Sequence, residues 1–368
     1  MPKPRKFVLI YDNFGPPMVD RCEAIASAGA EVIALEIFGA SSEYDWNNPP
    51  GSIFKKVTLF PASANGHVPF SQVLVKLIAT TWAHRAATFL VCHYDRPYIF
   101  IAAGVLRCIG VRVYVFMDSK FDDYQRYIWR EVVKRLFMLP YTGSIVASPR
   151  SADYVRWLGM PVSRIWPGSC AISTDRIRRQ RSTDVDVPFE DRTFVVVARL
   201  IEKKNIGNCL VAYRRYCQAV ERPRALTICG SGHLAGDLKA QAETLGIAAT
   251  VRFLGFRQTE EISDLLSGAL CLILPSSSEQ FGIVVAEALA LGVPVIASVN
   301  CGARDELVRT GVNGFVIEPD NPDGLAFFMR FLGANEKEWR AMRAATHKFA
   351  PLGDVSRLVA SLDLAERA

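Results

Sequence analysis

The chain has 368 residues, of which 50% are hydrophobic and 22% charged, and its formal net charge is +6. This composition excludes a disordered chain, and the length exceeds what one ordinary core organises, so we expect two domains. The small positive excess suits an anionic ligand or an anionic membrane surface, but it is too weak to indicate nucleic-acid binding.

The first half alternates β-rich runs with segments of helical period. We expect strands at 6–12, 31–38, 88–94, 111–118 and 144–148, and helices at 71–86 and 124–138. Such alternation is typical of βα units on a parallel sheet.

A polar segment at 175–191, with four arginines, several acids and a proline, interrupts the pattern and predicts a linker. The alternation then resumes with strands expected at 193–200, 225–230, 250–256, 270–276, 294–298 and 314–319. The sequence therefore predicts an α/β protein of two Rossmann-like parallel-sheet domains, which we expect to face each other across a cleft. Open sheets of this kind bind ligands at the carboxyl ends of their strands.

These patterns give domain boundaries. We place an N-terminal domain at 1–170, a linker at 171–190 and a C-terminal domain at 191–345. We expect the last segment, 346–368, to form a helix that packs back on the N-terminal domain.

Nine cysteines are scattered along the chain, without a C-x-x-C pair or neighbouring histidines. We therefore expect reduced thiols, a cytoplasmic protein and no metal site. No uninterrupted apolar run approaches the length that spans a bilayer.

Two carboxylates stand out in the segment SSSEQFGIVVAEALALGVPVIAS, residues 276–298. Glu279 follows an apolar strand, and Glu287 lies about a turn and a half into the helix that Gly282 opens. The missing side chain of Gly282 would let a phosphate approach the amides at the positive end of this helix. Taken alone, the pattern fits equally well a capping role for Glu279 and a solvated Glu287.

The run E-Q-F-G-I-V-V-A-E, followed by A-L-A-L-G-V-P-V-I-A, resembles the E-x7-E signature of GT-B retaining glycosyltransferases of family 4, also called glycosyl transferases group 1. Four more segments keep the order and spacing of that family: 198–205, 228–234, 251–256 and 301–326. The first half is similar in architecture and only loosely in sequence. The resemblance implies a hexosyltransferase that moves a sugar, with retention of anomeric configuration, from a UDP- or GDP-sugar to a glycan, lipid-linked or small-molecule acceptor.

The resemblance also implies roles for individual residues of the second half. Glu279 would bind hydroxyls of the donor sugar and Glu287 the ribose, because carboxylate oxygens accept several hydrogen bonds. Arg199 and Lys204 would neutralise the diphosphate as the glycosidic bond breaks. These fixed cations would replace a metal, so we expect neither a metal nor a cofactor beyond the nucleotide sugar.

Further binding residues follow from the same resemblance, all at loops that would line the donor. They are the amides of Phe281, Gly282 and Ile283, the glycine-rich turn at Gly230 and Gly232, the base-proximal pair Phe256 and Arg257, and Gly15 in the N-terminal domain.

The N-terminal domain departs from the family pattern. Where the family commonly has a histidine that touches the donor sugar, the strand at 111–118 ends in Met117 and Asp118. Asp118 would bond a sugar hydroxyl or steady positive charge on the anomeric carbon; a helix cap or a surface ion pair explains it equally well. His93 is the other candidate, with a satisfied core or rim histidine as its alternative.

The segment 123–140 combines basic with bulky aromatic residues, among them Arg126, Arg130, Lys134 and Arg135. It predicts an amphipathic helix, which either packs on its sheet or makes peripheral contact with an anionic membrane at the inner face of the cell membrane.

Three other functions compete with sugar transfer. A nucleotide-sugar-binding protein or an epimerase would keep the fold without transfer activity. A nicotinamide-dependent oxidoreductase would need G-x-G-x-x-G after the first strand of a half, which neither half has.

Overall fold

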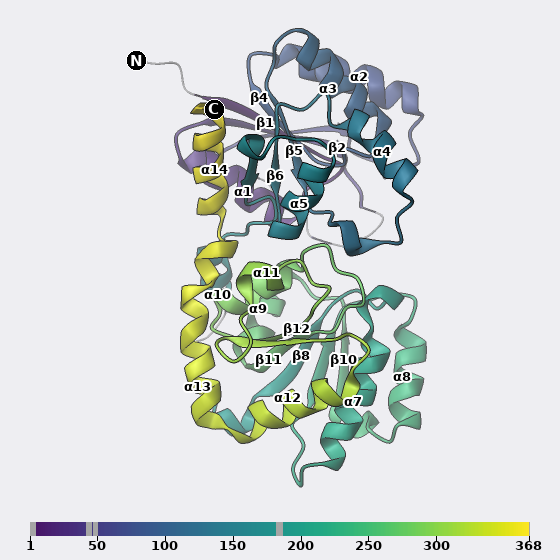
Figure 1. Cartoon of the computed structure of the whole chain (residues 1–368), viewed down its shortest axis with the longest axis vertical. Coiled ribbons are helices and arrows are strands. Elements are labelled where there is room, and N and C mark those ends of the chain that lie inside the picture. Colours follow the sequence, from purple (N-terminus) through teal and green to yellow (C-terminus); the bar gives the residue numbers. More distant parts are fainter. Residues whose placement is uncertain (1–4, 42–45, 47–50, 182–186, 368) are drawn as a thin grey trace. The chain divides into compact units, whose positions relative to one another are not determined.

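The computed structural model describes residues 5–41, 46, 51–181 and 187–367, which form two compact units. The first unit takes the described residues of Met1–Phe121, Gln125–Ser173 and Val355–Ala368; the second takes those of Asp122–Tyr124 and Thr174–Asp354. Each unit has its own parallel sheet with helices around it (Figure 1). The predicted α/β class with two Rossmann-like domains is confirmed.

The first unit contains a seven-stranded sheet in the order β3-β2-β1-β4-β5-β6-β7. Its strands are β1 (Lys6–Tyr11), β2 (Glu31–Phe38), β3 (Lys55–Phe60), β4 (Thr88–Val91), β5 (Val113–Met117), β6 (Gly143–Val146) and β7 (Ile165–Pro167). The five predicted strands are confirmed, but β3 and β7 were not predicted. Both are edge strands, in which partial exposure and, in β7, a proline remove the continuous apolar run of a central strand.

Helices flank this sheet. They are α1 (Pro16–Ser27), α2 (Phe70–Ala83), α3 (Pro97–Cys108), α4 (Ile128–Phe137), α5 (Pro149–Trp157) and α14 (Val355–Arg367). The last of these belongs to the first unit, where Tyr114 Oη donates to the Ala365 carbonyl over 2.9 Å and Ser361 Oγ donates to the Pro167 carbonyl over 2.7 Å.

The helix predicted at 124–138 begins only at Ile128. The residues just before it are not helical, and among them Arg126 Nε donates to the Phe121 carbonyl over 2.7 Å. A side chain that folds back on the preceding backbone in this way competes with helical hydrogen bonding.

The second unit contains a six-stranded sheet in the order β10-β9-β8-β11-β12-β13. Its strands are β8 (Thr193–Val197), β9 (Leu226–Cys229), β10 (Val251–Gly255), β11 (Ala269–Leu274), β12 (Val295–Ser298) and β13 (Gly314–Ile317). All six predicted strands are confirmed, each ending one to three residues earlier than predicted or at the predicted residue. The central strand β11 is buried at every position, as expected for a parallel strand covered on both faces.

The helices of this unit are α6 (Thr174–Gln180), α7 (Ile206–Gln218), α8 (Ala235–Thr244), α9 (Thr259–Ser267), α10 (Ile283–Ala290), α11 (Arg304–Leu307), α12 (Pro322–Ala334) and α13 (Glu336–Ala345). Part of the segment predicted as a linker is therefore helical: α6 buries Ile177, and Arg178 Nε donates to the Ala290 carbonyl at the end of α10 over 3.1 Å. Residues 182–186 of the predicted linker lie outside the described residues. Within the described part of the chain, no helix is long and apolar enough to cross a membrane.

Candidate functional site

The order of the second sheet brings the sequence motifs of that half together. Strand β8 lies between β9 and β11, and β12 follows β11. Because all strands of a parallel sheet end at the same edge, the loops that follow these four strands meet there. These loops and the start of α10 carry most of the predicted site residues.

Lys204 and Glu279 form an ion pair in this region. Lys204 belongs to a 3₁₀ turn, η4 (Glu202–Lys204), after β8, and Glu279 lies in the loop after β11. Their side chains are only 12% and 11% exposed. Ser276 Oγ also contacts Glu279 Oε2, at 3.2 Å. The structure thus brings two predicted residues into one buried charged pair.

Hydrogen bonds join the two loops that carry Lys204 and Glu279. The Ser277 amide donates to the Lys203 carbonyl over 2.9 Å, and Asn205 Nδ2 donates to the Pro275 carbonyl over 3.1 Å. Asn205 has a left-handed backbone (φ 56°), a conformation that asparagine adopts more readily than most residues. We had not predicted a role for Asn205; its place directly after two lysines at a strand exit was the available signal.

Gly230 and Gly232 are required by the neighbouring loop. A Cβ at Gly230 would lie 1.9 Å from the Ala198 carbonyl oxygen, and one at Gly232 would lie 2.3 Å from the Leu200 carbonyl oxygen. The Leu200 amide in turn donates to the Ser231 carbonyl over 2.8 Å. The glycine-rich turn therefore locks against the exit of β8, the loop that carries Arg199.

Gly282 has the positive φ of 93° at the start of α10, and a Cβ there would lie 2.8 Å from Leu274 Cδ2. We expected its missing side chain to leave room for a ligand; instead, the backbone conformation and the packing of the protein already require glycine. Phe281 is buried beside it, and Ile283 begins the helix. Glu287, one turn later, is 8% exposed, so the solvated alternative for this carboxylate is wrong.

The loop after β12 closes the site from the other side. The Gly302 amide donates to the Glu279 carbonyl over 3.2 Å, and the Cys301 thiol lies 2.9 Å from the Phe281 carbonyl oxygen. Burial and, after it, the charge of Glu279 raise the pKa of Cys301 to about 12. This cysteine is therefore a neutral packing residue under Glu279. Sequence reasoning missed its position, although it begins the matching run at 301–326.

Two predicted residues lie farther along the sheet. Phe256 and Arg257 follow β10, the edge strand, and Arg257 Nη1 pairs with Glu261 Oε1 in α9 over 2.9 Å. Both side chains of this pair are well exposed. By geometry alone, Arg257 is part of a surface ion pair at the helix start.

In the first unit, Gly15, His93 and Asp118 follow the adjacent strands β1, β4 and β5, so they share one edge of that sheet. A Cβ at Gly15 would lie 2.1 Å from the Trp46 ring, which accounts for glycine there. The Asp118 carbonyl accepts a hydrogen bond of 3.0 Å from Ser151 Oγ. His93 has a left-handed backbone, with φ of 59°.

A polar cluster around Asp12 lies at the same edge and was not predicted. Tyr98 Oη donates to Asp12 Oδ1 over 3.2 Å, and Arg96 Nη2 lies 3.6 Å from Asp12 Oδ2. Burial lowers the pKa of His93, but Cys92, Asp12 and Asp95 outweigh it and raise that pKa to about 10. His93 therefore lies close to the carboxylates of Asp12 and Asp95.

Metal ligands are not gathered anywhere in the described chain: no group of three or more His, Cys, Asp and Glu side chains has the geometry to hold an ion. All nine cysteines lie outside disulfide bonds.

The sequence profile of glycosyl transferases group 1 matches residues 179–349, which include every motif of the second unit described above. This similarity covers slightly less than half of the chain. An uncharacterised glycosyltransferase of Methanocaldococcus jannaschii is 34% identical over 154 residues, which are 42% of this chain and 38% of that protein. The chain thus matches well under half the length of this group 1 relative.

Solved structures match over nearly the whole chain. Sucrose-phosphate synthase from Thermosynechococcus elongatus is 18% identical, with a TM-score of 0.73 and coverage of 99% of this chain and 98% of that one. The Anabaena protein HepE, solved in complex with UDP and glucose, is 17% identical, with a TM-score of 0.71 and the same coverage. At this identity, the likeness establishes the GT-B fold.

Proposed function

We propose that the protein is a glycosyltransferase. It would move a sugar from a nucleotide-diphosphate sugar to an acceptor, with retention of configuration at the anomeric carbon. The observation that carries this proposal is the buried Lys204–Glu279 pair at the strand ends of a group 1 domain, followed one turn into α10 by the buried Glu287. Buried carboxylates of this kind are costly unless they have partners or a ligand to bind.

In this proposal, the second unit holds the donor. Glu279 bonds hydroxyls of the sugar, and Lys204 orients that carboxylate while it faces the diphosphate with Arg199. Phe281, Gly282 and Ile283 supply amides at the positive end of α10 for the phosphates, and Glu287 bonds the ribose. Gly230 and Gly232 position the Arg199 loop, and Phe256 and Arg257 lie toward the base.

Transfer then needs no metal ion, because Lys204 and Arg199 provide fixed positive charge where the leaving diphosphate gains negative charge. We propose a uridine or guanosine nucleotide. The Anabaena protein solved with UDP and glucose, which has this fold, supports the uridine form.

The first unit would bind the acceptor, which we take to be a glycan, a lipid-linked sugar or a small molecule of polysaccharide assembly. Gly15, His93 and Asp118 share the edge of the sheet at which open α/β sheets take their ligands. His93 would bind a polar group of the acceptor. We also propose a cytoplasmic protein in peripheral contact with an anionic membrane.

Product analysis tests the proposal. The protein is incubated with UDP-glucose, UDP-galactose, UDP-N-acetylglucosamine or GDP-mannose and a panel of acceptors, with and without EDTA. Release of the nucleoside diphosphate together with an α-linked product, unchanged by EDTA, is expected. The matched variants are Glu279→Gln, expected to lose turnover at least about a hundredfold, and Arg340→Gln, which removes an exposed ion pair with Glu336 in α13 and is expected to keep most of it. Nucleotide binding without any product or sugar release would favour the alternative, a nucleotide-sugar-binding protein. Conversion of one nucleotide sugar into another would favour the epimerase.

A further inference from the structure

Helix α4 has its apolar side turned outward. Its only buried residue is Glu131, whereas Ile128, Trp129 and Leu136 are 69%, 65% and 59% exposed. Val132 and Val133 are also exposed. At 3.6 residues per turn, these five apolar positions form one stripe, and a helix on a sheet normally buries such a stripe. The sequence had left open whether this helix packs on its sheet; its apolar side does not.

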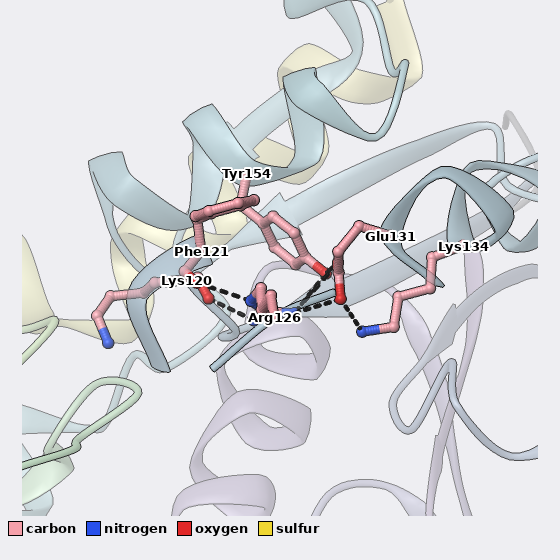
Figure 2. A network of polar contacts seen from close by, with 6 residues as sticks. All are labelled: Lys120, Phe121, Arg126, Glu131, Lys134 and Tyr154. Atoms are coloured by element: carbon pink, nitrogen blue, oxygen red, sulfur yellow. Dashed lines mark hydrogen bonds and ion pairs between the residues drawn. The ribbon is translucent and has the colours of Figure 1, made fainter. Parts of the chain in front are cut away.

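A polar network holds α4 in this orientation (Figure 2). Glu131 Oε1 accepts from Arg126 Nη1 over 3.2 Å and from Lys134 Nζ over 2.7 Å, and Glu131 Oε2 accepts from Tyr154 Oη over 2.5 Å. Arg126, whose side chain is 4% exposed, also donates to the carbonyls of Lys120 and Phe121. Hydrogen bonds to the α5 residue Tyr154 therefore hold the inner side of α4, beside the contact of Phe137 with Phe100 of α3, whose ring centres are 5.0 Å apart.

The charges of the helix favour an anionic partner. Between Gln125 and Pro140, Glu131 is the only acid, and it is engaged in the network. Arg130 and Arg135 are exposed beside the apolar stripe. The Arg130 guanidinium lies 5.2 Å from the ring centre of Tyr127 and 5.1 Å from that of Trp129. Such mixed aromatic and cationic side chains are typical of the headgroup region of a bilayer.

A pocket of about 350 Å³ lies beside the C-terminal end of α4. Arg135 and Arg164 line it together with apolar side chains, among them Leu136, Leu139 and Met160. Leu139 continues the exposed apolar stripe beyond the helix, at 74% exposure. The pocket therefore combines two cations with an apolar lining, which suits a phosphate-bearing headgroup above its first acyl carbons.

We propose that the outward face of α4, formed by Ile128, Trp129, Val132, Val133, Leu136 and Leu139 and flanked by Arg130 and Arg135, docks on an anionic phospholipid bilayer. The apolar stripe enters the headgroup region, and the arginines contact lipid phosphates. The ten residues of α4 rise about 15 Å, which is too short to cross a bilayer, so we expect the helix to lie along the membrane surface. The inference deepens the peripheral contact proposed above and rests on it, but it does not depend on sugar transfer.

Vesicle sedimentation tests this docking face with the full chain. The vesicles are phosphatidylcholine alone or phosphatidylcholine mixed with phosphatidylglycerol. The apolar variant carries Trp129→Ser and Leu136→Ser; the charge variant carries Arg130→Gln and Arg135→Gln. The matched control is Phe327→Ser, which removes an aromatic side chain of similar exposure, 53%, from α12 of the second unit.

The wild type and the control are expected to bind vesicles that contain phosphatidylglycerol and to be released by high salt. The apolar variant is expected to bind at least about tenfold more weakly, and the charge variant to bind both vesicle types equally poorly. Absence of wild-type binding, or an equal loss in Phe327→Ser, would overturn the proposal. So would a wild-type dimer that the apolar variant dissociates, because the face would then be an interface between copies. The melting-temperature rise with UDP or GDP, measured on every variant, reports separately on the donor site and on folding.

Discussion

Lys204 and Glu279 are 75 residues apart in the chain, yet they form a buried ion pair because β8 and β11 are neighbours in the second sheet. The pair joins two motifs that lie far apart in the sequence. It gives the candidate site both its cation and its carboxylate.

Because each charge is largely buried, removing one leaves the other without its main compensation. We expect Lys204→Met and Glu279→Gln each to lower the free energy of unfolding by about 2 kcal/mol. The double variant should cost less than the two together, by about 1 kcal/mol or more. Urea denaturation of the four proteins measures this coupling. Simple additivity would show that the pair contributes nothing to the folded state.

The glycine-rich turn predicts a contrast between two alanine substitutions. Gly230→Ala places a Cβ against the Ala198 carbonyl oxygen, so we expect a loss of about 2 kcal/mol or more and a weaker response to nucleotide. Gly236→Ala is the control: it lies in α8 with nothing within 4 Å of its new Cβ, and should be neutral or stabilising by up to about 1 kcal/mol. Thermal melts compare them. Equal effects would contradict the close approach of the two loops.

The network around Glu131 predicts a dependence on acid. Although burial opposes it, hydrogen bonds from Lys134 and Tyr154 and the charge of Arg126 lower the pKa of Glu131 below 4.5. A carboxyl with a depressed pKa stabilises the fold above its unfolded pKa and loses that contribution as the pH falls through its folded pKa. The protection of α4 amides against hydrogen exchange, relative to their intrinsic rates at each pH, should therefore fall below about pH 4.5. In Glu131→Gln the exchange should be faster at neutral pH and change less with acid; identical pH profiles would contradict the role of Glu131.

The cysteines predict selective thiol labelling. Of the nine, all of which lie in described residues, only Cys108 is exposed. Burial raises the pKa of Cys209 and of Cys301 to about 12, so neither provides thiolate at neutral pH. We expect one thiol per chain to react fast with a thiol reagent in the native protein, and no thiol to react fast in Cys108→Ser. Several fast equivalents in that variant would contradict the packing around the other thiols.

The second unit was largely predictable from the sequence, because its central strands are continuous apolar runs and its motifs keep a fixed order. The contact between Lys204 and Glu279 was not, since it depends on the strand order rather than on spacing along the chain. Asn205 and Cys301 were missed for the same reason. They support the site through backbone carbonyls and burial, which leave no distinct residue pattern.

The first unit was less predictable. Strands β3 and β7 lie at the edges and lack a buried apolar run. The amphipathic pattern of α4 was visible in the sequence, but the direction of its apolar side was not. That direction depends on Arg126 and Tyr154, which bind Glu131 and hold it on the buried side of the helix. Helical periodicity identifies two faces of a helix; only tertiary partners determine which one is buried.

In the proposed function, the second unit binds a nucleotide sugar through Glu287 and the charges around Glu279. A thermal-shift titration with UDP, GDP, ADP and their common sugars, with and without EDTA, tests it on the wild type and on Glu287→Gln. A ligand that binds only the folded protein raises the melting temperature by mass action. We predict a rise with one nucleotide and its sugars, unchanged by EDTA and at least halved in the variant. No rise with any nucleotide, or a rise with NAD alone, would contradict the account.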